Sequence, residues 1–596
     1  MWYYALTFID VVHRYFNWAG RLLLRFYPNI YVDIKSSGIG LHPEIYASIG
    51  GFSFVVSIFA SIIISYVSII SLLIAYIPFI LAFSIFLPVL VFIIAGFILP
   101  KALSINNAAG YDQEAPYVFA YMSVMVTGGI SPYTAFERLD SAEILFKRFS
   151  KAAKRFKLMV RAMGWDPLSA FDDLASRVKS MLIKDVIFGY VATVGAGGDV
   201  VDYLIKRSRD VFSGLVVKIK SAGEKMSTLL ESYLAASFLL IMTLNVMYMI
   251  TISIARISIP GINVYSLFFF SYLLMPFLSI MVIYLSDLVQ YREPGLIWDP
   301  YIVFLSISLP IFIFLSYIAF IPYFYPVSLQ PFAWLSARAV WAINSILTYL
   351  GVELVYAPAF ALSIVLFISL LPSTLYEIFV FRKYSKISSG VVKFLRDMVE
   401  VRKTGLSPER CITSLAERDY GYFTKYLREA ASKIALGFPL RRVYEDLMAR
   451  VKVWRANVFL FTLIDAIEVG GGTPETIENL AYFAEMSEAV ERERAASIRI
   501  LLVIPYLGAV ILISSIMFMA VYMSTFAVGI VEYHVAVRII VPATVLNVLF
   551  MGLMAGKVST GVLASGFKHA LLLSLLSMAV ILTSPRMAML FGAFGR

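Results

Sequence analysis

The sequence predicts an all-α, polytopic membrane protein with about nine transmembrane helices and two repeated cytoplasmic helical bundles. Of the 596 residues, 60% are hydrophobic and 15% are charged, whereas a soluble domain is nearer half apolar and a quarter charged. The apolar residues gather in long blocks, and a helix needs roughly 20 of them to cross a bilayer. Two charged segments separate these blocks, and their sequences match each other.

The order of the predicted elements follows from these blocks. Candidate spans lie at about 52–76, 78–100, 229–255, 263–286, 301–325, 356–380, 499–526, 535–556 and 568–590. The corresponding domains are an N-terminal cytoplasmic amphipathic segment (1–50), a transmembrane hairpin (51–100), a first cytoplasmic bundle (101–228), transmembrane helices (229–380), a second cytoplasmic bundle (382–498) and C-terminal transmembrane helices (499–596).

The N-terminal segment does not have the pattern of a signal peptide. It mixes Arg14, Arg21 and Arg25 with scattered aromatic residues, and no compact apolar region precedes a small-residue cleavage site. This pattern predicts a basic amphipathic helix that lies on the membrane surface. A polar hinge at 36–38 follows it.

The distribution of basic residues predicts the topology. Most lysines and arginines lie in the two charged segments, and the short loops that carry Arg292, Lys557 and Lys568 follow the same bias. Basic residues accumulate on the cytoplasmic side of membrane proteins. Four predicted spans separate the two segments, so both are expected in the cytoplasm. The protein is therefore expected in the cell membrane, with its N-terminus inside and its C-terminus outside.

Several classes of site are not expected. The single cysteine, Cys411, allows no disulfide within the chain and no multi-cysteine metal site. The four histidines lie far apart in sequence, so we expect neither a metal nor a cofactor. The net charge of +11 is explained by cytoplasmic lysines and arginines, and nucleic-acid binding is not expected. Asp287, Glu353 and Glu377 lie at the estimated ends of spans, whereas transporters place ionisable groups near the bilayer centre.

The two charged segments share three blocks of sequence. The repeated positions of the first copy are Gly129, Ser131, Pro132, Gly164, Asp173, Arg177, Gly197 and Gly198, and those of the second are Gly405, Ser407, Pro408, Gly437, Asp446, Arg450, Gly470, Gly471 and Gly472. In the first block, glycine ends one helix, serine caps the next, and proline occupies its first turn, where a missing N–H costs nothing. Apolar residues between the blocks have helical spacing. Each copy is therefore predicted to be a bundle of five or six helices whose last helix continues into the membrane.

The repeated motifs do not match catalytic signatures. A phosphate-binding loop needs a lysine after its second glycine, and neither glycine-rich block has one. Residues 195–199 approach the Gly-x-Gly-Asp motif of intramembrane aspartyl proteases, but Ala196 replaces its first glycine. The paired acids at 172–173 and 445–446 precede Arg177 and Arg450 at helical spacing, which favours salt bridges within each copy.

Two charged surfaces are candidate docking sites for a cytoplasmic partner, although charged runs are also common on solvated faces. The candidate contacts are Lys147, Arg148 and Lys151 in the first copy and Arg441, Arg442, Glu485 and Glu488 in the second.

The doubled pattern resembles the F-domain family of type II secretion and type IV pilus platform proteins, particularly its archaeal branch. The matching positions are the Gly-x-Ser-Pro starts at 129–132 and 405–408, the glycine turns at 164–168 and 437–440, and the glycine pairs at 197–198 and 470–472. Residues 37–46, before the first span, also resemble the archaeal members.

This resemblance implies a membrane platform without enzymatic activity of its own and without a cofactor. It implies a cytoplasmic hexameric secretion ATPase and pilin-like filament subunits as partners, and a homodimer or small homo-oligomer. It leaves open whether the filament is an archaellum, an adhesion pilus, a DNA-exchange pilus or a secretion pseudopilus. The first copy has Asp199 and no proline after its glycines, so equal roles for the two copies also stay open.

Two alternative functions are compared with this one. A transporter or channel built from parallel repeats predicts polar, broken helices at the bilayer centre. A membrane-embedded peptidase predicts a pair of facing aspartates, which the sequence does not provide.

Overall fold

The regular structure of this protein is helical, as predicted. The computed structural model describes residues 2–38, 41–70, 88–89, 91–253, 268–291, 294–295, 298–326, 332–470, 472–526, 530–587 and 589. No strand occurs within these ranges. Nine helical stretches in the described part of the chain are long and apolar enough to cross a membrane, which agrees with the nine predicted spans.

Each copy of the repeat forms six helices in the same order. The first consists of α5 (Leu99–Thr127), α6 (Pro132–Arg138), α7 (Lys147–Lys157), α8 (Pro167–Arg177), α9 (Met181–Gly195) and α10 (Val200–Ser253). The second consists of α16 (Ala357–Lys403), α17 (Pro408–Leu415), α18 (Tyr422–Ala435), α19 (Leu440–Arg450), α20 (Trp454–Gly470) and α21 (Pro474–Leu501). The predicted bundles of five or six helices are confirmed.

The remaining helices precede, separate and follow the two copies. They are α1 (Trp2–Phe26), α2 (Ile30–Ser36), α3 (Pro43–Ile70), α12 (Met275–Val289), α13 (Asp299–Val303), α14 (Leu309–Leu315), α15 (Ala333–Tyr349), α22 (Val503–Phe526), α23 (Ile530–Thr560) and α24 (Gly566–Leu582). α3 begins eight residues before the predicted boundary at 51. Between α14 and α16, the amphipathic helix α15 was not predicted; its buried Ser336, Ile343 and Leu347 lie on one face.

The chain folds into two compact units whose borders cut through the second copy. The first unit contains residues 1–211, 402–408 and 457–483, and the second contains 212–401, 409–456 and 484–596. The first unit therefore combines most of the first copy with α20 and the beginning of α21. The second unit holds α17–α19 and most of the apolar helices. The predicted bundle at 382–498 is thus divided, because long-range packing groups its last helices with the first copy.

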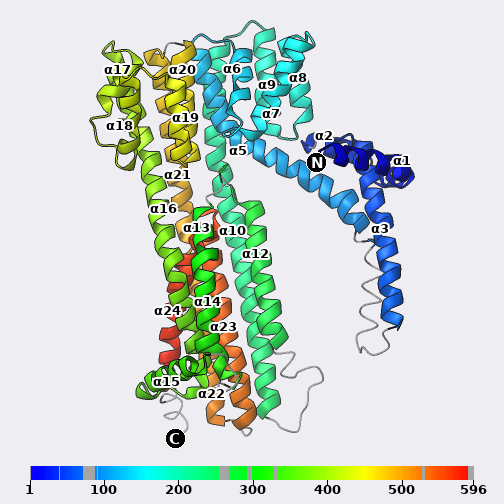
Figure 1. Ribbon diagram of the computed structural model, residues 1–596, viewed down its shortest axis with the longest axis vertical. Helices are drawn as coiled ribbons and strands as arrows, with labels where there is room; N and C mark the ends of the chain where they lie inside the picture. Colours follow the sequence, from blue (N-terminus) through cyan, green and yellow to red (C-terminus); the bar gives the residue numbers. More distant parts are fainter. Residues whose placement is uncertain are drawn as a thin grey trace. The chain divides into compact units, whose positions relative to one another are not determined.

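An aromatic cluster forms the core of the first unit. Phe136, Phe156 and Phe171 come from α6, α7 and α8, and their ring centroids lie 4.4–5.3 Å apart. Tyr190 of α9 meets Phe171 edge to face at 5.3 Å. Figure 1 shows α6–α9 packed together as one bundle. Burial of these large side chains is the main stabilising contribution available to such short helices.

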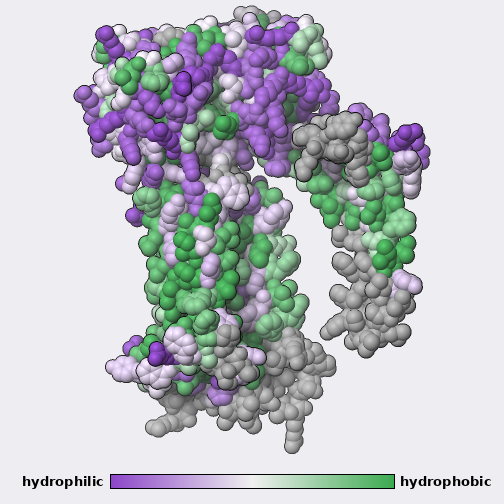
Figure 2. Space-filling model, in the orientation of Figure 1, coloured by the Kyte–Doolittle hydropathy of each residue, from purple (hydrophilic) through white to green (hydrophobic). Residues whose placement is uncertain are grey.

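In the second unit, aromatic side chains pack the short helices against α16, and the backbones of two spans approach each other closely. Phe394 of α16 contacts Phe423 of α18, with centroids 5.7 Å apart. A Cβ on Gly556 of α23 would lie only 1.9 Å from the backbone nitrogen of Gly566 in α24. Small residues permit such contact between membrane helices. Figure 2 shows hydrophobic side chains along the spans of this unit and hydrophilic ones over α17–α19.

The predicted continuity between bundle and span is confirmed for both copies. α10 runs for 54 residues without a break. In the second copy, one helical stretch runs from Pro474 to Tyr522, with a single irregular turn at Leu502 between α21 and α22. Pro505 explains this irregular turn, because its ring nitrogen has no hydrogen to donate to the carbonyl of Leu501.

Candidate functional site: two charged bundles

The glycines at the three repeated turns adopt matching backbone conformations. The φ angles are +86° at Gly129 and +88° at Gly405, +69° at Gly164 and +85° at Gly437, and +70° at Gly197 and +55° at Gly472. This left-handed region favours glycine because it has no Cβ. The sequence match at these positions therefore reflects equivalent turns, as predicted.

Side-chain caps begin the helices after these turns. The Ser131 hydroxyl accepts the Thr134 N–H at 3.4 Å at the start of α6, and the Thr473 hydroxyl accepts the Thr476 N–H at 3.3 Å at the start of α21. The Asp199 carboxylate accepts the N–H groups of Val201 and Asp202 at 2.8 and 3.1 Å. Asp199 is therefore the N-cap of α10, a structural role that replaces the threonine cap of the second copy.

The predicted salt bridge within α8 is confirmed. Arg177 Nε donates to the Asp173 carboxylate at 2.7 Å, and Arg155 of α7 lies 3.7 Å away from the same group. The hydrogen bond from Arg177 lowers the pKa of Asp173. Arg155 therefore links α7 to α8 through a carboxylate that Arg177 also binds.

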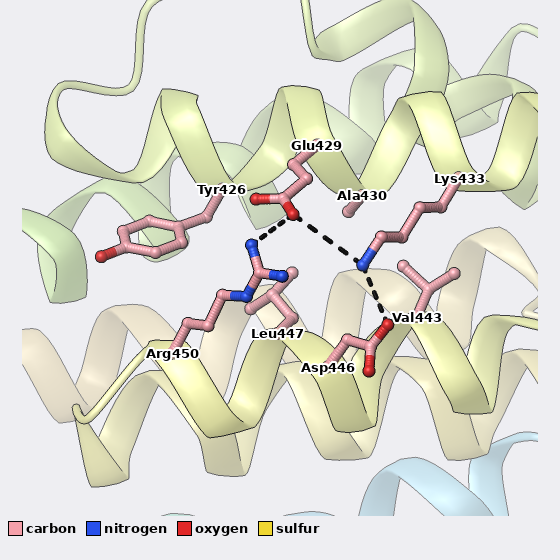
Figure 3. A pocket seen from close by; sticks show the side chains of 8 residues that line it. All are labelled: Tyr426, Glu429, Ala430, Lys433, Val443, Asp446, Leu447 and Arg450. Atoms are coloured by element: carbon pink, nitrogen blue, oxygen red, sulfur yellow. Dashed lines mark hydrogen bonds and ion pairs between the residues drawn. The ribbon is translucent and has the colours of Figure 1, made fainter.

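The corresponding prediction for the second copy is wrong in its partners. Arg450 pairs with Glu429 of α18 rather than with Asp446, and Asp446 accepts a hydrogen bond from Lys433 at 2.9 Å. Figure 3 shows these pairs across the α18–α19 hollow. A residue four positions away on a helix was the expected partner, but a neighbouring helix offers the opposite charge. The hollow is lined by Tyr426, Glu429, Ala430, Lys433, Val443, Asp446, Leu447 and Arg450. Its charged lining residues pair with one another, so it is a structural contact.

An equivalent lysine ties each copy to the segment before its first span. Lys179, which follows α8, forms an ion pair with Asp33 of α2, and the Tyr27 hydroxyl donates to the same aspartate at 2.7 Å. Lys452, which follows α19, lies 3.4 Å from Asp299 at the start of α13. There the hydroxyl of Tyr384 donates to Asp299 at 3.3 Å.

These two Lys–Asp–Tyr groups were not predicted. Their signal was the lysine that ends the matched Arg-Val-Lys stretches at 177–179 and 450–452. The partners lie 146 and 153 residues away in the chain, beyond the reach of spacing arguments. We call these the anchor lysines.

Asp465 joins the two copies within the first unit. Its carboxylate is 1% exposed and accepts two hydrogen bonds from the Arg138 guanidinium, at 2.5 and 3.0 Å. The Tyr121 hydroxyl donates to it at 2.6 Å. On the same side, Asn479 Nδ2 donates to the Thr127 hydroxyl at 3.0 Å. In the sequence, Asp465 stands out as an acid inside an apolar run of α20. Spacing within that helix could not identify its partner, because Arg138 belongs to another helix.

The candidate docking residues of the first copy occupy the start of α7. Lys147 and Lys151 are exposed, and Arg148 is half-buried. The buried Glu114 carboxylate accepts the backbone N–H groups of Arg148 and Phe149 at 3.1 Å, which caps this helix. Arg148 therefore has a structural role, while the two lysines are accessible.

The candidate residues of the second copy lie on separate helices. Arg442 is exposed and Arg441 is half-buried at the start of α19. Glu485 of α21 pairs with Arg396 of α16 at 2.5 Å, and Glu488 is half-buried beside it. Glu485 therefore contributes to helix packing, and Arg442 is the most accessible of the four residues.

Two acids that were predicted at the ends of spans are paired with lysines in the second unit. Glu377 of α16 is fully buried and lies 3.4 Å from Lys568 of α24. Asp287 of α12 pairs with Lys557 of α23. Asp287 lies near the end of the stretch Phe270–Val289, as predicted, whereas Glu377 lies in the middle of the long stretch Leu354–Lys403. The basic partners of both acids stabilise helix packing.

Comparison with known proteins identifies the repeated bundle. The family described as type II secretion system (T2SS), protein F matches residues 118–248 and, a second time, residues 394–522. An uncharacterised protein of Methanocaldococcus jannaschii, MJ1286, is 22% identical over 448 residues, which cover 70% of each chain. No solved structure matches the chain.

Proposed function

Because this multi-pass membrane protein carries the domain of the type II secretion system protein F family twice, we propose that it is the platform of a pilus-like assembly machine. In this role it couples a cytoplasmic hexameric ATPase to the insertion of pilin-like subunits into a filament. The duplicated domain supports this proposal most directly. Both copies keep the same helix order, glycine turns and anchor lysines.

The proposed site of action is the pair of charged bundles on the cytoplasmic side of the membrane. The excess of lysine and arginine in these segments supports this orientation. We propose a mechanical role without catalysis by this chain. The repeated acids Asp173 and Asp446 favour it, because both form salt bridges.

Binding of the ATPase tests this function directly. The full-length protein in lipid nanodiscs is expected to bind the purified hexameric secretion ATPase of the same organism. Deletion of the gene is expected to abolish filaments without loss of pilin synthesis. The proposal fails if the intact protein shows no ATPase binding and the deletion strain assembles filaments normally.

The accessible arginines provide a sharper test of the docking site. Arg441→Glu with Arg442→Glu is expected to slow ATPase association and to change its salt dependence, because exposed charges act mainly on the encounter rate. Lys425→Glu is the matched control, since this exposed lysine lies near the other end of α18. Equal association rates for both variants would exclude the arginines as contacts.

A transporter is the alternative function, and the spans argue against it. Asp287 and Glu377 each form a structural ion pair with a lysine of another helix. Flux of a solute through proteoliposomes that contain the protein alone would favour the transporter.

A further inference from the structure

An exposed apolar pair flanks the same left-handed glycine in both copies. Met163 and Trp165 flank Gly164 and are 59% and 44% exposed; Leu436 and Phe438 flank Gly437 and are 76% and 45% exposed. We call these the first and second tip pairs. We propose that they are equivalent contact points for a cytoplasmic protein built from identical subunits, each with an apolar hollow edged by carboxylates.

The turns themselves do not explain this exposure. After α18, the Gly437 N–H donates to the Ile434 carbonyl at 2.9 Å and the Phe438 N–H to the Lys433 carbonyl at 3.1 Å. In this type of helix end, the residue after the glycine usually packs its side chain onto the last helical turn. Phe438 stays 45% exposed instead. The backbone requires the glycine, but it does not require a large apolar residue on either side.

In the first copy, the turn exposes a similar apolar pair but has a different backbone conformation. Residues 158–162 form a π-helical turn, and the Trp165 N–H donates to the Met159 carbonyl at 3.0 Å. A Cβ built on Gly164 or on Gly437 would meet no atom within 4 Å. Both turns therefore project into open space. The apolar pair recurs although the local hydrogen bonding differs, which favours a functional reason.

Within the second unit, the second tip pair lies at the end of its bundle remote from the spans. At the other end of α18, Lys386 of α16 stacks on the Tyr422 ring at 5.7 Å. At the other end of α19, Lys452 reaches Asp299. The α18–α19 turn is opposite both contacts.

The first tip pair has the same placement within the first unit. α7 begins beside Glu114, in the middle of α5, and α8 ends next to the Lys179–Asp33 ion pair. The turn that carries the first tip pair is therefore at the opposite end of both helices. The anchor lysines lie at the end of each bundle that faces the spans. The tip pairs lie at the opposite end, where a cytoplasmic protein can contact them and the lipid bilayer cannot.

Charge and duplication define the partner. At the second tip pair, exposed Arg442 and half-buried Arg441 lie one helical turn beyond Phe438, so a surface complementary to this pair carries carboxylates around its apolar hollow. Exposed apolar groups with a polar rim are typical of protein interfaces. Two similar pairs on one chain suit a partner that repeats its binding surface, as a symmetric homo-oligomer does. This inference rests on the proposed function, in which the hexameric ATPase is that partner.

Serine substitutions of the tip pairs test the proposal in full-length protein. The variants are Met163→Ser with Trp165→Ser, Leu436→Ser with Phe438→Ser, and all four together. The probe is the purified hexameric secretion ATPase, and its affinity for the protein in nanodiscs is measured. Each double variant is expected to lower the affinity roughly tenfold or more, and the fourfold variant is expected to lower it further than either one.

The control removes exposed apolar groups from the other end of the first bundle. Ile144 and Met181 are 79% and 73% exposed, and Ile144→Ser with Met181→Ser is expected to leave the affinity unchanged. Circular dichroism and elution volume check that every variant is folded. A variant that unfolds is replaced by the milder Trp165→Gln or Phe438→Gln, for which the same loss of affinity is expected.

The outcomes separate this inference from the function on which it rests. If the wild-type protein binds the ATPase and the fourfold variant binds equally well, the tip pairs are not the contact and the platform function stands. If the wild-type protein does not bind the ATPase, the tip-pair proposal fails, and the platform function fails with it if the deletion strain also assembles filaments normally. If the fourfold variant loses self-association and keeps ATPase affinity, the tip pairs join copies of this chain, which overturns the proposal.

Discussion

Asp465 is the residue that links the two copies most closely. Its buried carboxylate depends on Arg138 and Tyr121 for its hydrogen bonds. Removal of one member of a buried ion pair leaves an uncompensated charge, whereas replacement of both members is much less costly. The pair therefore controls how firmly α20 is held within the first unit.

Loss of the arginine tests this dependence. Arg138→Met is expected to destabilise the first unit by about 3 kcal/mol, the typical cost of breaking a buried ion pair. The measurement is thermal unfolding of the purified protein. Arg138→Met combined with Asp465→Asn is expected to regain part of that loss. Equal destabilisation by the single and the double variant would show that the two side chains are energetically independent.

The anchor lysines make a second prediction for single residues. Lys179→Met and Lys452→Met remove the ion pairs with Asp33 and Asp299. Asp33 is buried, so loss of Lys179 leaves a buried acid with only its Tyr27 hydrogen bond. We expect faster hydrogen exchange in α2 after Lys179→Met and in α13 after Lys452→Met.

The two anchors are expected to differ in strength. Asp33 is 3% exposed in its side chain and Asp299 is 28% exposed, and a partly solvated pair contributes less. The effect of Lys179→Met should therefore be the larger one. Lys425→Met is the control, because this lysine is exposed. Equal exchange rates in all three variants would contradict an anchoring role.

Among the helices, α1 has the pattern expected of a helix in the membrane interface. Tyr15, Trp18, Leu22 and Phe26 form a stripe at helical spacing and are 43–66% exposed. The opposite face is buried on α3, where a Cβ on Gly20 would lie 2.7 Å from the backbone of Ser48. The basic residues Arg14, Arg21 and Arg25 are exposed and flank the stripe on the helical projection.

A depth measurement checks this arrangement. The chain has one cysteine, Cys411, which is buried, so Cys411→Ala provides a background for single spin labels. A label at Leu22→Cys in nanodiscs is expected to be more accessible to oxygen than to a water-soluble nickel chelate, because apolar faces enter the acyl boundary. A label at Asn17→Cys, on the polar side, should show the opposite preference. The same preference at both positions would exclude an interfacial helix.

The chain as a whole makes a prediction about topology. Both bundles should lie on one side of the membrane and α15 on the other. In the Cys411→Ala background, Ile144→Cys and Leu436→Cys report on the two bundles and Tyr349→Cys reports on α15; these positions are 79%, 76% and 91% exposed. An impermeant maleimide applied to intact cells is expected to label the α15 position and to spare both bundle positions.

Lysis is the control for this experiment, since all three cysteines should then react. Labelling of one bundle position and not the other in intact cells would place the copies on opposite sides. That result would contradict the even number of spans between them and the basic-residue bias on which the orientation depends.

Much of the architecture could be predicted because it depends on short-range properties. Long apolar runs are sufficient for the spans, and Gly129, Gly164 and their counterparts are required by left-handed turns. The Arg177–Asp173 pair follows from helical spacing. The same reasoning was wrong for Arg450, since a nearer acid belongs to another helix.

The sequence by itself determined that this is a helical membrane protein with one charged unit used twice. Only the tertiary structure decided that Asp465 binds Arg138, that the anchor lysines reach Asp33 and Asp299, and that the tip pairs stay exposed. The physical reason is the separation along the chain over which each kind of interaction acts. Helix periodicity, caps and turns act between residues a few positions apart, whereas burial and long-range ion pairs depend on which helices pack together.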